Sequence, residues 1–319
     1  MLKKILITGA SGFAGRYLAQ QLVKLENNEL FGTYLAENSK VVLLDISFKI
    51  NLVNLDLMDF KSVTNIIEKI RPDQIYHLAA LTSPTQSFKE PSAVMINNIS
   101  SELNLLEAVK NAELKTRIII ISSAEVYGKV DSSDLPIDED TPLKPGNPYA
   151  VSKLTQDFMG LQYNIAYGLD AIRVRPFNHI GPGQTEHFAT SAFAKKIAEI
   201  EKGIRKPILT VGNLDAKRDF TNVKDMMRAY ILLMEKGKSG DVYNIGSGIS
   251  YKMGDVLDIL LSFSSAQIKI EIDPNLLRPS DNPELLCDNK KFVDLTGWKP
   301  EIDIETTLRE ILEYWRKKV

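Results

Sequence analysis

A tyrosine and a lysine, Tyr149 and Lys153, lie four positions apart in the chain. On a helix this spacing places both side chains on one face, and the turn-forming residues 145–148 predict that a helix begins there. A free tyrosine has a pKa of about 10 and is a poor acid or base near pH 7. A neighbouring ammonium group favours the phenolate and lowers that pKa, so the pair suits acid–base catalysis. Taken alone, the pair is also compatible with an ordinary helix surface.

Glycines at positions 9, 12 and 15 follow the first apolar run of the chain. Glycine lets the backbone turn tightly and approach a phosphate with no Cβ in the way. The helix predicted after them offers free amides and the positive end of its dipole to an anion. The order of strand, glycine turn and helix predicts a dinucleotide site, and a plain strand-to-helix turn is the alternative.

Short apolar runs alternate with longer amphipathic stretches through the first half of the chain. Such alternation predicts an α/β fold, namely a Rossmann-like, doubly wound parallel sheet with helices on both faces. The run of four isoleucines at 118–121 predicts a strand that is covered on both sides. The expected strands are 2–8, 29–34, 50–56, 74–81, 117–122 and 241–245.

The sequence pattern changes after residue 175, where glycines and prolines become denser. We therefore expect two domains. An NAD(P)-binding Rossmann domain comprises 1–174 together with about 219–248. A smaller, mixed α/β, C-terminal domain for the substrate comprises 175–218 and 249–319.

The composition excludes several classes of function. The 319 residues carry 39 basic and 41 acidic side chains, and a net charge of −2 gives no bulk attraction to nucleic acid or an anionic membrane. The one cysteine, Cys287, excludes an internal disulfide and fits a reducing compartment. With three histidines no zinc-ligand spacing is present, so no metal is expected. No apolar run is long enough to span a bilayer, and we expect a cytoplasmic enzyme.

The glycine spacing of three and three, rather than two and three, resembles the extended short-chain dehydrogenase/reductase family, the NAD-dependent epimerases and dehydratases. The resemblance covers essentially the whole chain and includes Asp56-Leu57 and the His77–Ala80 segment. His179 lies in a hinge between the two predicted domains. The resemblance implies that it contacts the cofactor, and a structural role is the alternative. The resemblance implies that a nicotinamide dinucleotide contacts Gly9, Ser11, Gly12, Phe13, Gly15, Asp56, Leu57, Leu78, Ala79, Ala80, Tyr149, Lys153 and His179.

The segment at the end of the second predicted strand bears on the choice of cofactor. A carboxylate there accepts hydrogen bonds from the ribose 2′-hydroxyl of NAD and repels a 2′-phosphate. Residues 31–34 contain none, the first acidic residue is Glu37, and Arg16 follows the glycine turn. We therefore expect NADP, with NAD as the alternative.

The family's catalytic Ser or Thr and its Tyr-x-x-x-Lys pair match Ser123, Tyr149 and Lys153. The resemblance implies that Tyr149 is the acid–base, Lys153 holds the nicotinamide ribose, and Ser123 hydrogen-bonds the reacting sugar oxygen. In the family's 4,6-dehydratases a glutamate in the place of Glu125 removes the C5 proton. The residue before it helps the C6 hydroxyl leave, but here it is Ala124, which has no proton to give. The alternative to a catalytic role is that Glu125 is a carboxylate at the end of a strand, where it accepts hydrogen bonds from backbone amides.

The string around Asn178, Arg-Val-Arg-Pro-Phe-Asn-His-Ile-Gly-Pro-Gly-Gln, is most similar to the GDP-4-keto-6-deoxy-D-mannose reductases of this family, and GDP-mannose 4,6-dehydratases share part of it. By that resemblance Asn178 contacts the sugar or its phosphate, and Arg218, Arg278 and Asp281 bind the nucleotide diphosphate. Arginine suits phosphate because its planar fork binds two oxygens at once. A surface ion pair between Arg218 and Asp219 is the alternative.

We therefore expect a reductase that transfers a hydride from NADPH or NADH to the C4 ketone of a GDP-4-keto-6-deoxyhexose, with Tyr149 as the acid. The product would be a GDP-6-deoxyhexose of the GDP-rhamnose type. A GDP-mannose or dTDP-glucose 4,6-dehydratase with Glu125 as base, and a nucleotide-sugar 4-epimerase, are the alternatives. A cofactor-sensing protein without catalysis is a fourth, although such proteins tend to lose the tyrosine or the lysine.

The expected partners are a GDP-sugar substrate and a second copy of the chain, with neither nucleic acid nor membrane. Family members often dimerise through helices that match 91–112 and 147–168. An apolar side of the first helix could pack on the sheet or on another subunit, and the sequence does not separate the two. This side carries Met95, Ile99, Leu103, Leu106 and Val109.

Overall fold

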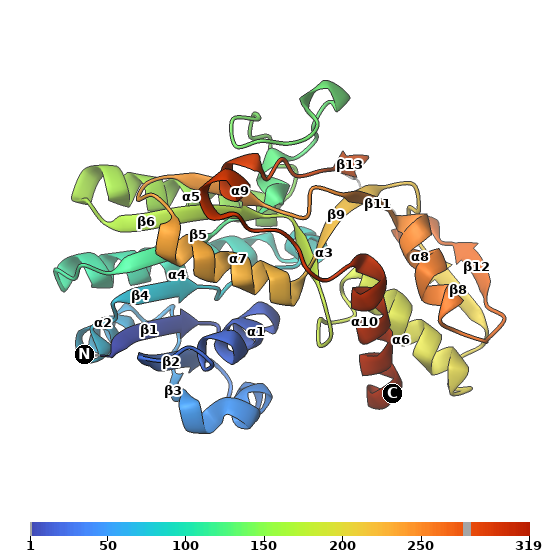
Figure 1. Cartoon of the computed structure of the whole chain (residues 1–319), viewed down its shortest axis with the longest axis horizontal. Helices are drawn as coiled ribbons and strands as arrows, with labels where there is room; N and C mark the ends of the chain where they lie inside the picture. Colours follow the sequence, from blue (N-terminus) through green and yellow to red (C-terminus); the bar gives the residue numbers. More distant parts are fainter. Residues whose placement is uncertain (1, 277–281) are drawn as a thin grey trace.

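The computed structural model describes residues 2–276 and 282–319. Its largest element is a sheet of seven strands in the order β10-β6-β5-β4-β1-β2-β3 (Figure 1). All neighbouring strands are parallel, so each connection crosses over a face of the sheet. The strands are β1 (Lys3–Thr8), β2 (Asn28–Tyr34), β3 (Asn51–Asn54), β4 (Gln74–His77), β5 (Arg117–Ile121), β6 (Asp170–Pro176) and β10 (Val242–Ile245).

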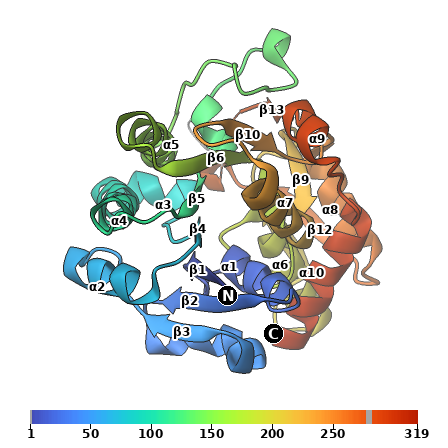
Figure 2. The same cartoon turned by 60° about the vertical axis from the view of Figure 1, so that its left-hand side comes forward.

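Helices cover both faces of this sheet (Figure 2). Side chains alternate between the two faces along a strand. In β5, Ile118 and Ile120 pack with the core on one face, whereas Ile119 packs with the core on the other. The doubly wound, Rossmann-like sheet predicted from the sequence is confirmed. One face carries α2 (Phe60–Ile70), α4 (Pro91–Asn111) and α5 (Pro148–Tyr167), and the other carries α1 (Phe13–Leu22) and α7 (Val223–Lys236).

A smaller part of the molecule lies beside the carboxyl ends of the sheet strands (Figure 1, right). It contains a mixed four-stranded sheet and a two-stranded sheet, as predicted for a mixed α/β C-terminal part. Its apolar core is formed by side chains of three helices, α6, α8 and α10. A hydrogen bond also connects two of these helices, because the Trp315 indole of α10 donates to the Ser191 hydroxyl of α6 at 2.9 Å. Its elements are β7 (Asn178–Ile180), α6 (Ala189–Glu201), β8 (Ile208–Val211), β9 (Lys217–Asn222), β11 (Ser250–Lys252), α8 (Met253–Ser262), β12 (Lys269–Ile272), β13 (Glu284–Leu285) and α10 (Ile304–Lys318). Two shorter helices, α3 (Pro84–Lys89) and α9 (Lys290–Thr296), lie beside the larger sheet.

The long helix α4 buries part of its apolar side and leaves another part exposed. Leu106 and Val109 are buried, but Leu103 is 40% exposed. The buried face also includes three polar residues, Asn98, Ser101 and Glu102. Hydrophobic periodicity assigns polar residues to solvent, so it does not reveal the polar part of this buried face. Within the described part of the chain, neither this helix nor any other is long and apolar enough to cross a membrane.

A buried ion pair holds α5 on the sheet. The Asp157 carboxylate has no exposure and accepts from Arg173 at 2.7 Å and from Arg175 at 2.8 Å, both on β6. Arg175 also donates to the Tyr127 hydroxyl at 3.1 Å. A buried ion pair adds little net stability, but removing one partner is costly because the other charge is left uncompensated. The contact therefore determines the position of α5.

Replacing Asp157 by Asn is expected to lower the free energy of unfolding by about 3 kcal/mol, because two buried guanidinium groups lose their counter-charge. The control is Asp170→Asn, which removes a partly exposed partner of Arg117 and is expected to cost less than about 1 kcal/mol. Urea unfolding followed by circular dichroism measures both variants. Equal losses would contradict the special role of the buried pair.

Candidate active site

Strands β1 and β4 are neighbours at the point where the chain reverses its direction of winding. From β1 the sheet continues through β2 and β3 to one edge, and from β4 it continues to the other. Such a switch point leaves a crevice at the carboxyl ends of the strands, where α/β sheets bind ligands. Thr8 and His77 are paired in register there, with Thr8 Oγ1 2.8 Å from His77 Nδ1. Burial lowers the pKa of His77 to about 3, so its ring is neutral.

Gly9, Gly12 and Gly15 form a tight turn between β1 and α1. Gly9 has a φ of +68°, and a Cβ there would lie 2.8 Å from the Ala79 Cα. A Cβ on Gly15 would lie 2.2 Å from the Gly9 carbonyl oxygen, so turn and helix touch backbone to backbone. Gly12 caps α1 without a side-chain acceptor, which leaves amides of the first turn able to bind an anion. This geometry fits the pyrophosphate of a dinucleotide.

The other residues expected at the cofactor lie at the same end of the sheet. Residues 78–80 directly follow β4 and are half-buried, and Ser11 lies in the glycine turn. Beyond β3, Leu57 is buried and Asp56 is exposed. The structure therefore gathers these residues at the carboxyl ends of β1, β3 and β4.

Phe13 and His179 stack on each other, with ring planes 1° apart and centroids separated by 6.1 Å. Tyr17, also on α1, donates its hydroxyl hydrogen to the Pro182 carbonyl at 2.8 Å. These contacts hold the segment beyond β6 against the start of α1. Burial lowers the pKa of His179 to about 4, and its Nδ1 has no hydrogen-bond partner among residues 2–276 and 282–319. A neutral ring with a free nitrogen fits both the cofactor contact and the structural alternative.

Ser123 and Tyr149 come together from separate elements. Ser123 follows β5 and caps a short 3₁₀ turn (Ala124–Tyr127), where its Oγ accepts from the Glu125 N–H at 3.2 Å. Tyr149 is the second residue of α5 and is buried. Burial raises the pKa of the Tyr149 phenol, and a hydrogen bond with the Ser123 hydroxyl acts in the opposite direction. The two hydroxyls form an arrangement that can hydrogen-bond a single oxygen atom.

Lys153 lies one turn beyond Tyr149 on the buried side of α5. Its Nζ donates to Gln156 Oε1 at 2.6 Å. Burial lowers the pKa of Lys153 to about 8, whereas the charges of Glu102 and Asp157 act to raise it. The ammonium form therefore predominates at pH 7, and it lies on the same buried side of α5 as Tyr149.

Glu125 is held by Asn147, a residue not singled out from the sequence. Asn147 caps α5, accepting from the Ala150 N–H at 2.8 Å, and its Nδ2 donates to Glu125 Oε2 at 3.1 Å. An Asn before a helix is a recognisable capping signal, but its contact 22 residues away is not. The charge of Glu125 acts to raise the pKa of Tyr149, so the carboxylate lies near the phenol. The preceding Ala124 is buried in an apolar cluster.

The residues expected at the substrate lie in the smaller part of the molecule. Asn178 begins β7 and is half-buried. Arg218, on β9, donates to two backbone carbonyls. Asp219 is fully buried and accepts from backbone amides, which contradicts the alternative of a surface ion pair. Arg278 and Asp281 lie outside the described residues.

These groups support proton transfer beside a bound dinucleotide. Ser123 and Tyr149 can share an oxygen atom, Lys153 brings a positive charge, and the glycine turn offers backbone amides to phosphates. A bound nicotinamide cofactor would supply or accept a hydride. In the part of the chain that the structure describes, no group of three or more His, Cys, Asp or Glu side chains could hold a metal ion.

Comparison with known families defines the class of protein. The profile of the family described as GDP-mannose 4,6 dehydratase matches residues 6–311. The chain belongs to the extended short-chain dehydrogenase/reductase family of NAD-dependent epimerases and dehydratases. Members are NAD(P)-dependent enzymes that modify nucleotide sugars, so the resemblance noted in the sequence is confirmed.

Individual relatives include both a reductase and a dehydratase. The chain is 34% identical to GDP-6-deoxy-D-mannose reductase from Pseudomonas aeruginosa, covering 100% of this chain and 99% of the relative. It is 28% identical to GDP-mannose 4,6-dehydratase from Vibrio cholerae, covering 98% and 93%. The solved structure of RMD from Pseudomonas aeruginosa complexed with NADPH is similar with a TM-score of 0.86 at 33% identity, covering 99% of this chain and 100% of that one. The reaction must therefore be argued from the site.

Gly9→Ala is expected to weaken NADPH binding by about tenfold or more, because the new Cβ would meet the Ala79 backbone and strain a turn with positive φ. Gly203→Ala is the matched control, since its φ of +72° is equally unfavourable but a Cβ there meets no atom within 4 Å. Fluorescence titration with NADPH measures both affinities. Unchanged binding in Gly9→Ala would show that the phosphates lie elsewhere.

Proposed function

We propose that this protein reduces the C4 ketone of a GDP-4-keto-6-deoxyhexose to a GDP-6-deoxyhexose of the GDP-rhamnose type. The observation that carries the proposal is Ala124, which lies buried between Ser123 and Glu125. A 4,6-dehydratase needs a proton donor at this place, and an alanine methyl has none. Similarity over the full length to a GDP-6-deoxy-D-mannose reductase supports the same reaction.

Tyr149 is the proton donor in this reaction. The bound nicotinamide cofactor supplies the hydride. The Tyr149 phenol protonates the C4 oxygen as negative charge develops there, while the Ser123 hydroxyl hydrogen-bonds the same oxygen. The Lys153 ammonium stabilises the phenolate that remains. Glu125, tied to Asn147, orients this side of the site and abstracts no proton.

NADPH is the proposed reductant because the end of β2 presents no free carboxylate. Tyr34, the last residue of β2, donates to Glu37 Oε1 at 2.9 Å, and Lys40 donates to Glu37 Oε2 at 2.5 Å. The nearest acidic side chain is thus paired with a cation, which weakens its repulsion of a 2′-phosphate. The similar structure complexed with NADPH supports this choice.

The nucleotide end of the substrate is assigned to the smaller part of the molecule. Arg218 would bind the diphosphate together with Arg278, and Asp281 would accept from the ribose hydroxyls. Asn178 begins the strand that follows β6 and would contact the sugar or its phosphate. These assignments place the sugar between Asn178 and the Ser123–Tyr149 pair.

A 4,6-dehydratase is the second candidate, and the position of Glu125 favours it. A carboxylate beside Tyr149 and steadied by Asn147 has the chemistry of a base for the C5 proton. A 4-epimerase needs only the serine, tyrosine and lysine with a tightly held cofactor. Both alternatives regenerate the cofactor within a turnover, so neither consumes NADPH.

The reaction is tested in two mixtures, one with GDP-4-keto-6-deoxymannose and NADPH, the other with GDP-mannose and catalytic NADP. Loss of NADPH absorbance is expected in the first, and no 4-keto product in the second. Tyr149→Phe is expected to lose about 10²- to 10⁴-fold in kcat while binding NADPH as before, because only the transferred proton is removed. Repeating the first mixture with NADH measures the cofactor preference.

Glu125→Gln is the variant that separates the candidates. A reductase should retain kcat within about tenfold, because Gln has a similar size and can still bond to Asn147. A dehydratase should lose its activity with the base. A 4-keto product in the second mixture that disappears in this variant would replace the reductase by the dehydratase.

The outer sides of α4 and α5 support the proposal of a homodimer. Leu103 on α4 and Phe158 and Ile165 on α5 are 40%, 48% and 75% exposed. At about 100° per residue, Phe158 lies opposite Tyr149 on the helix, so this face is separate from the candidate active site. Two copies packed through this face would cover the apolar side chains.

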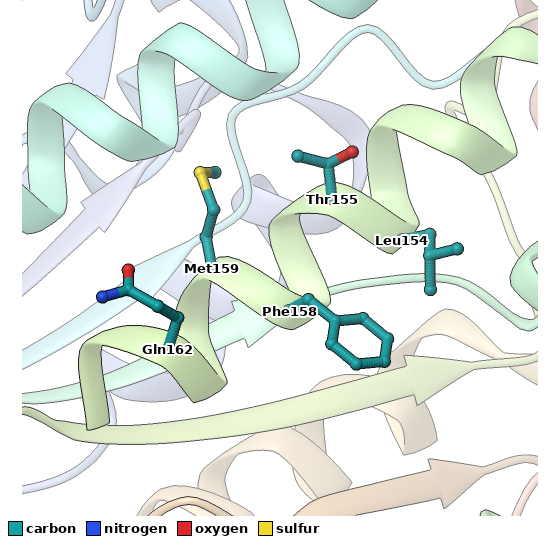
Figure 3. Close-up of a pocket in the computed structure, with 5 residues that line it drawn as sticks. All are labelled: Leu154, Thr155, Phe158, Met159 and Gln162. Carbon is teal, nitrogen blue, oxygen red and sulfur yellow. The ribbon is translucent and has the colours of Figure 1, made fainter. Parts of the chain in front are cut away.

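The same face of α5 carries a hollow of about 470 Å³, to which Phe158 contributes. The hollow is lined by Leu154, Thr155, Phe158, Met159 and Gln162 (Figure 3).

Phe158→Asp is expected to convert the dimer to a monomer, because a carboxylate at the centre of an apolar contact loses its hydration without a partner. Ile204→Asp is the control, since Ile204 is equally apolar and 65% exposed but lies after α6, in the smaller part. Light scattering after size exclusion gives the masses. A monomeric parent protein would show the dimer proposal to be wrong.

A further inference from the structure

Gln156 is a buried glutamine of α5 whose side-chain amide contacts two different helices. Its Oε1 accepts a hydrogen bond from Lys153 Nζ at 2.6 Å, and its Nε2 donates to the Asn98 carbonyl of α4 at 2.9 Å. Gln156 and Asn98 have no solvent exposure, and Lys153 is 3% exposed. Polar groups buried this fully depend on hydrogen-bond partners. Gln156 therefore forms a bridge between the candidate catalytic lysine and the neighbouring helix.

The chemistry of these two neighbours determines which way the Gln156 amide points. The Lys153 ammonium only donates hydrogen bonds, and a backbone carbonyl only accepts them. The amide oxygen must therefore face Lys153, and the amide nitrogen must face Asn98. A glutamate would place a carboxylate against the Asn98 carbonyl, and a methionine would contribute no hydrogen bond to either group. Within residues 2–276 and 282–319, the bond to Gln156 is the one hydrogen bond that the ammonium makes.

Asn98 anchors the far end of this bridge. Its side chain accepts from the Leu81 N–H at 2.8 Å and donates to the Leu81 carbonyl at 3.1 Å, so it holds both backbone groups of that residue. The Asn98 Nδ2 also donates to the Ser152 hydroxyl of α5 at 2.9 Å. Leu81 comes directly after residues 78–80, which follow β4 and are expected at the cofactor. The bridge therefore fixes the Lys153 ammonium relative to that segment.

We propose that Gln156 is a positioning residue that holds the Lys153 ammonium in place beside the segment after β4, where the cofactor is proposed to bind. The inference rests on the proposed contact of Lys153 with the nicotinamide ribose. An ammonium has three N–H groups, and Gln156 binds one of them. Because the Gln156 amide is anchored at both ends, the other two N–H groups are held in set directions. Without the bridge, the long lysine side chain would regain rotamer freedom.

The test is the dissociation constant of NADPH, measured by fluorescence titration without any sugar. Gln156→Met keeps the length of the side chain but removes both hydrogen bonds, and it is expected to weaken NADPH binding about three- to tenfold. Lys153→Met should weaken binding at least as much. Adding Gln156→Met to Lys153→Met should cause no further loss, because Gln156 acts through the lysine.

Two results would overturn the proposal. One is a Gln156→Met protein that binds NADPH as tightly as the parent. The other is an equal loss of affinity from Gln156→Met with and without Lys153. Because NADPH binding needs no sugar, these results are separate from the two reaction mixtures that test the proposed reduction.

Tyr163→Phe is the matched control, because Tyr163 also connects α5 to α4. Its hydroxyl donates to Glu107 Oε1 at 2.5 Å, about two turns beyond Gln156 on α5. The change removes a hydrogen bond between the same two helices without touching Lys153, so NADPH binding should be unchanged. An equal loss of affinity in this variant would show that Gln156 acts through helix packing in general, and would contradict a positioning role.

Melting temperatures measure the contact between Gln156 and Lys153 without any cofactor. Gln156→Met leaves a buried ammonium without its acceptor, whereas the double variant with Lys153→Met has no ammonium to satisfy. The double variant should therefore lose less than the sum of the single losses, and additive losses would contradict the contact. Should Gln156→Met fail to fold, recovery of folding in the double variant supports the proposal, and continued unfolding contradicts it.

Discussion

Asp157 has no contact with solvent, and two arginines of β6 share its carboxylate. Such a contact fixes geometry more than it adds stability, because each charge would be costly to bury without the others. Helix α5 is thereby held to one position on the sheet, and that helix carries Tyr149 and Lys153. The candidate chemistry depends on this constraint, since a small displacement of the phenol from its hydrogen-bonding partners reduces catalysis strongly.

The second constraint is the parallel sheet. Because the strands run in one direction, their carboxyl ends meet at one edge, and the order of winding leaves a crevice between β1 and β4. The glycine turn after β1 and the Ser123 turn after β5 are separated by more than a hundred residues in the chain, yet both open at that edge. The smaller part of the molecule lies beside the same edge (Figure 1). Residues of several strands and of the smaller part therefore lie at one edge of the sheet.

Within this scaffold a few side chains decide the reaction. The fold and the Ser–Tyr–Lys set are compatible with reduction, dehydration and epimerisation, so neither identifies the activity. Ala124 has no proton to donate, although elimination needs a donor at this position. Glu125, which accepts a hydrogen bond from Asn147, has a carboxylate that could act as a base. Behind the same site, Gln156 accepts a hydrogen bond from Lys153 and donates one to the Asn98 carbonyl of α4.

The sequence by itself determined the doubly wound sheet, the glycine turn and the tyrosine–lysine pair, because these depend on local periodicity and on the special backbone freedom of glycine. It also carried the family resemblance. The tertiary structure alone decided that Glu102 and Asn98 are buried and Leu103 is exposed, that Asn147 holds Glu125, and that Asp157 is shared between arginines. Each of these is a contact between polar or apolar groups of different elements. Local pattern assigns polar residues to solvent, whereas their burial depends on partners that only the packing of distant segments supplies.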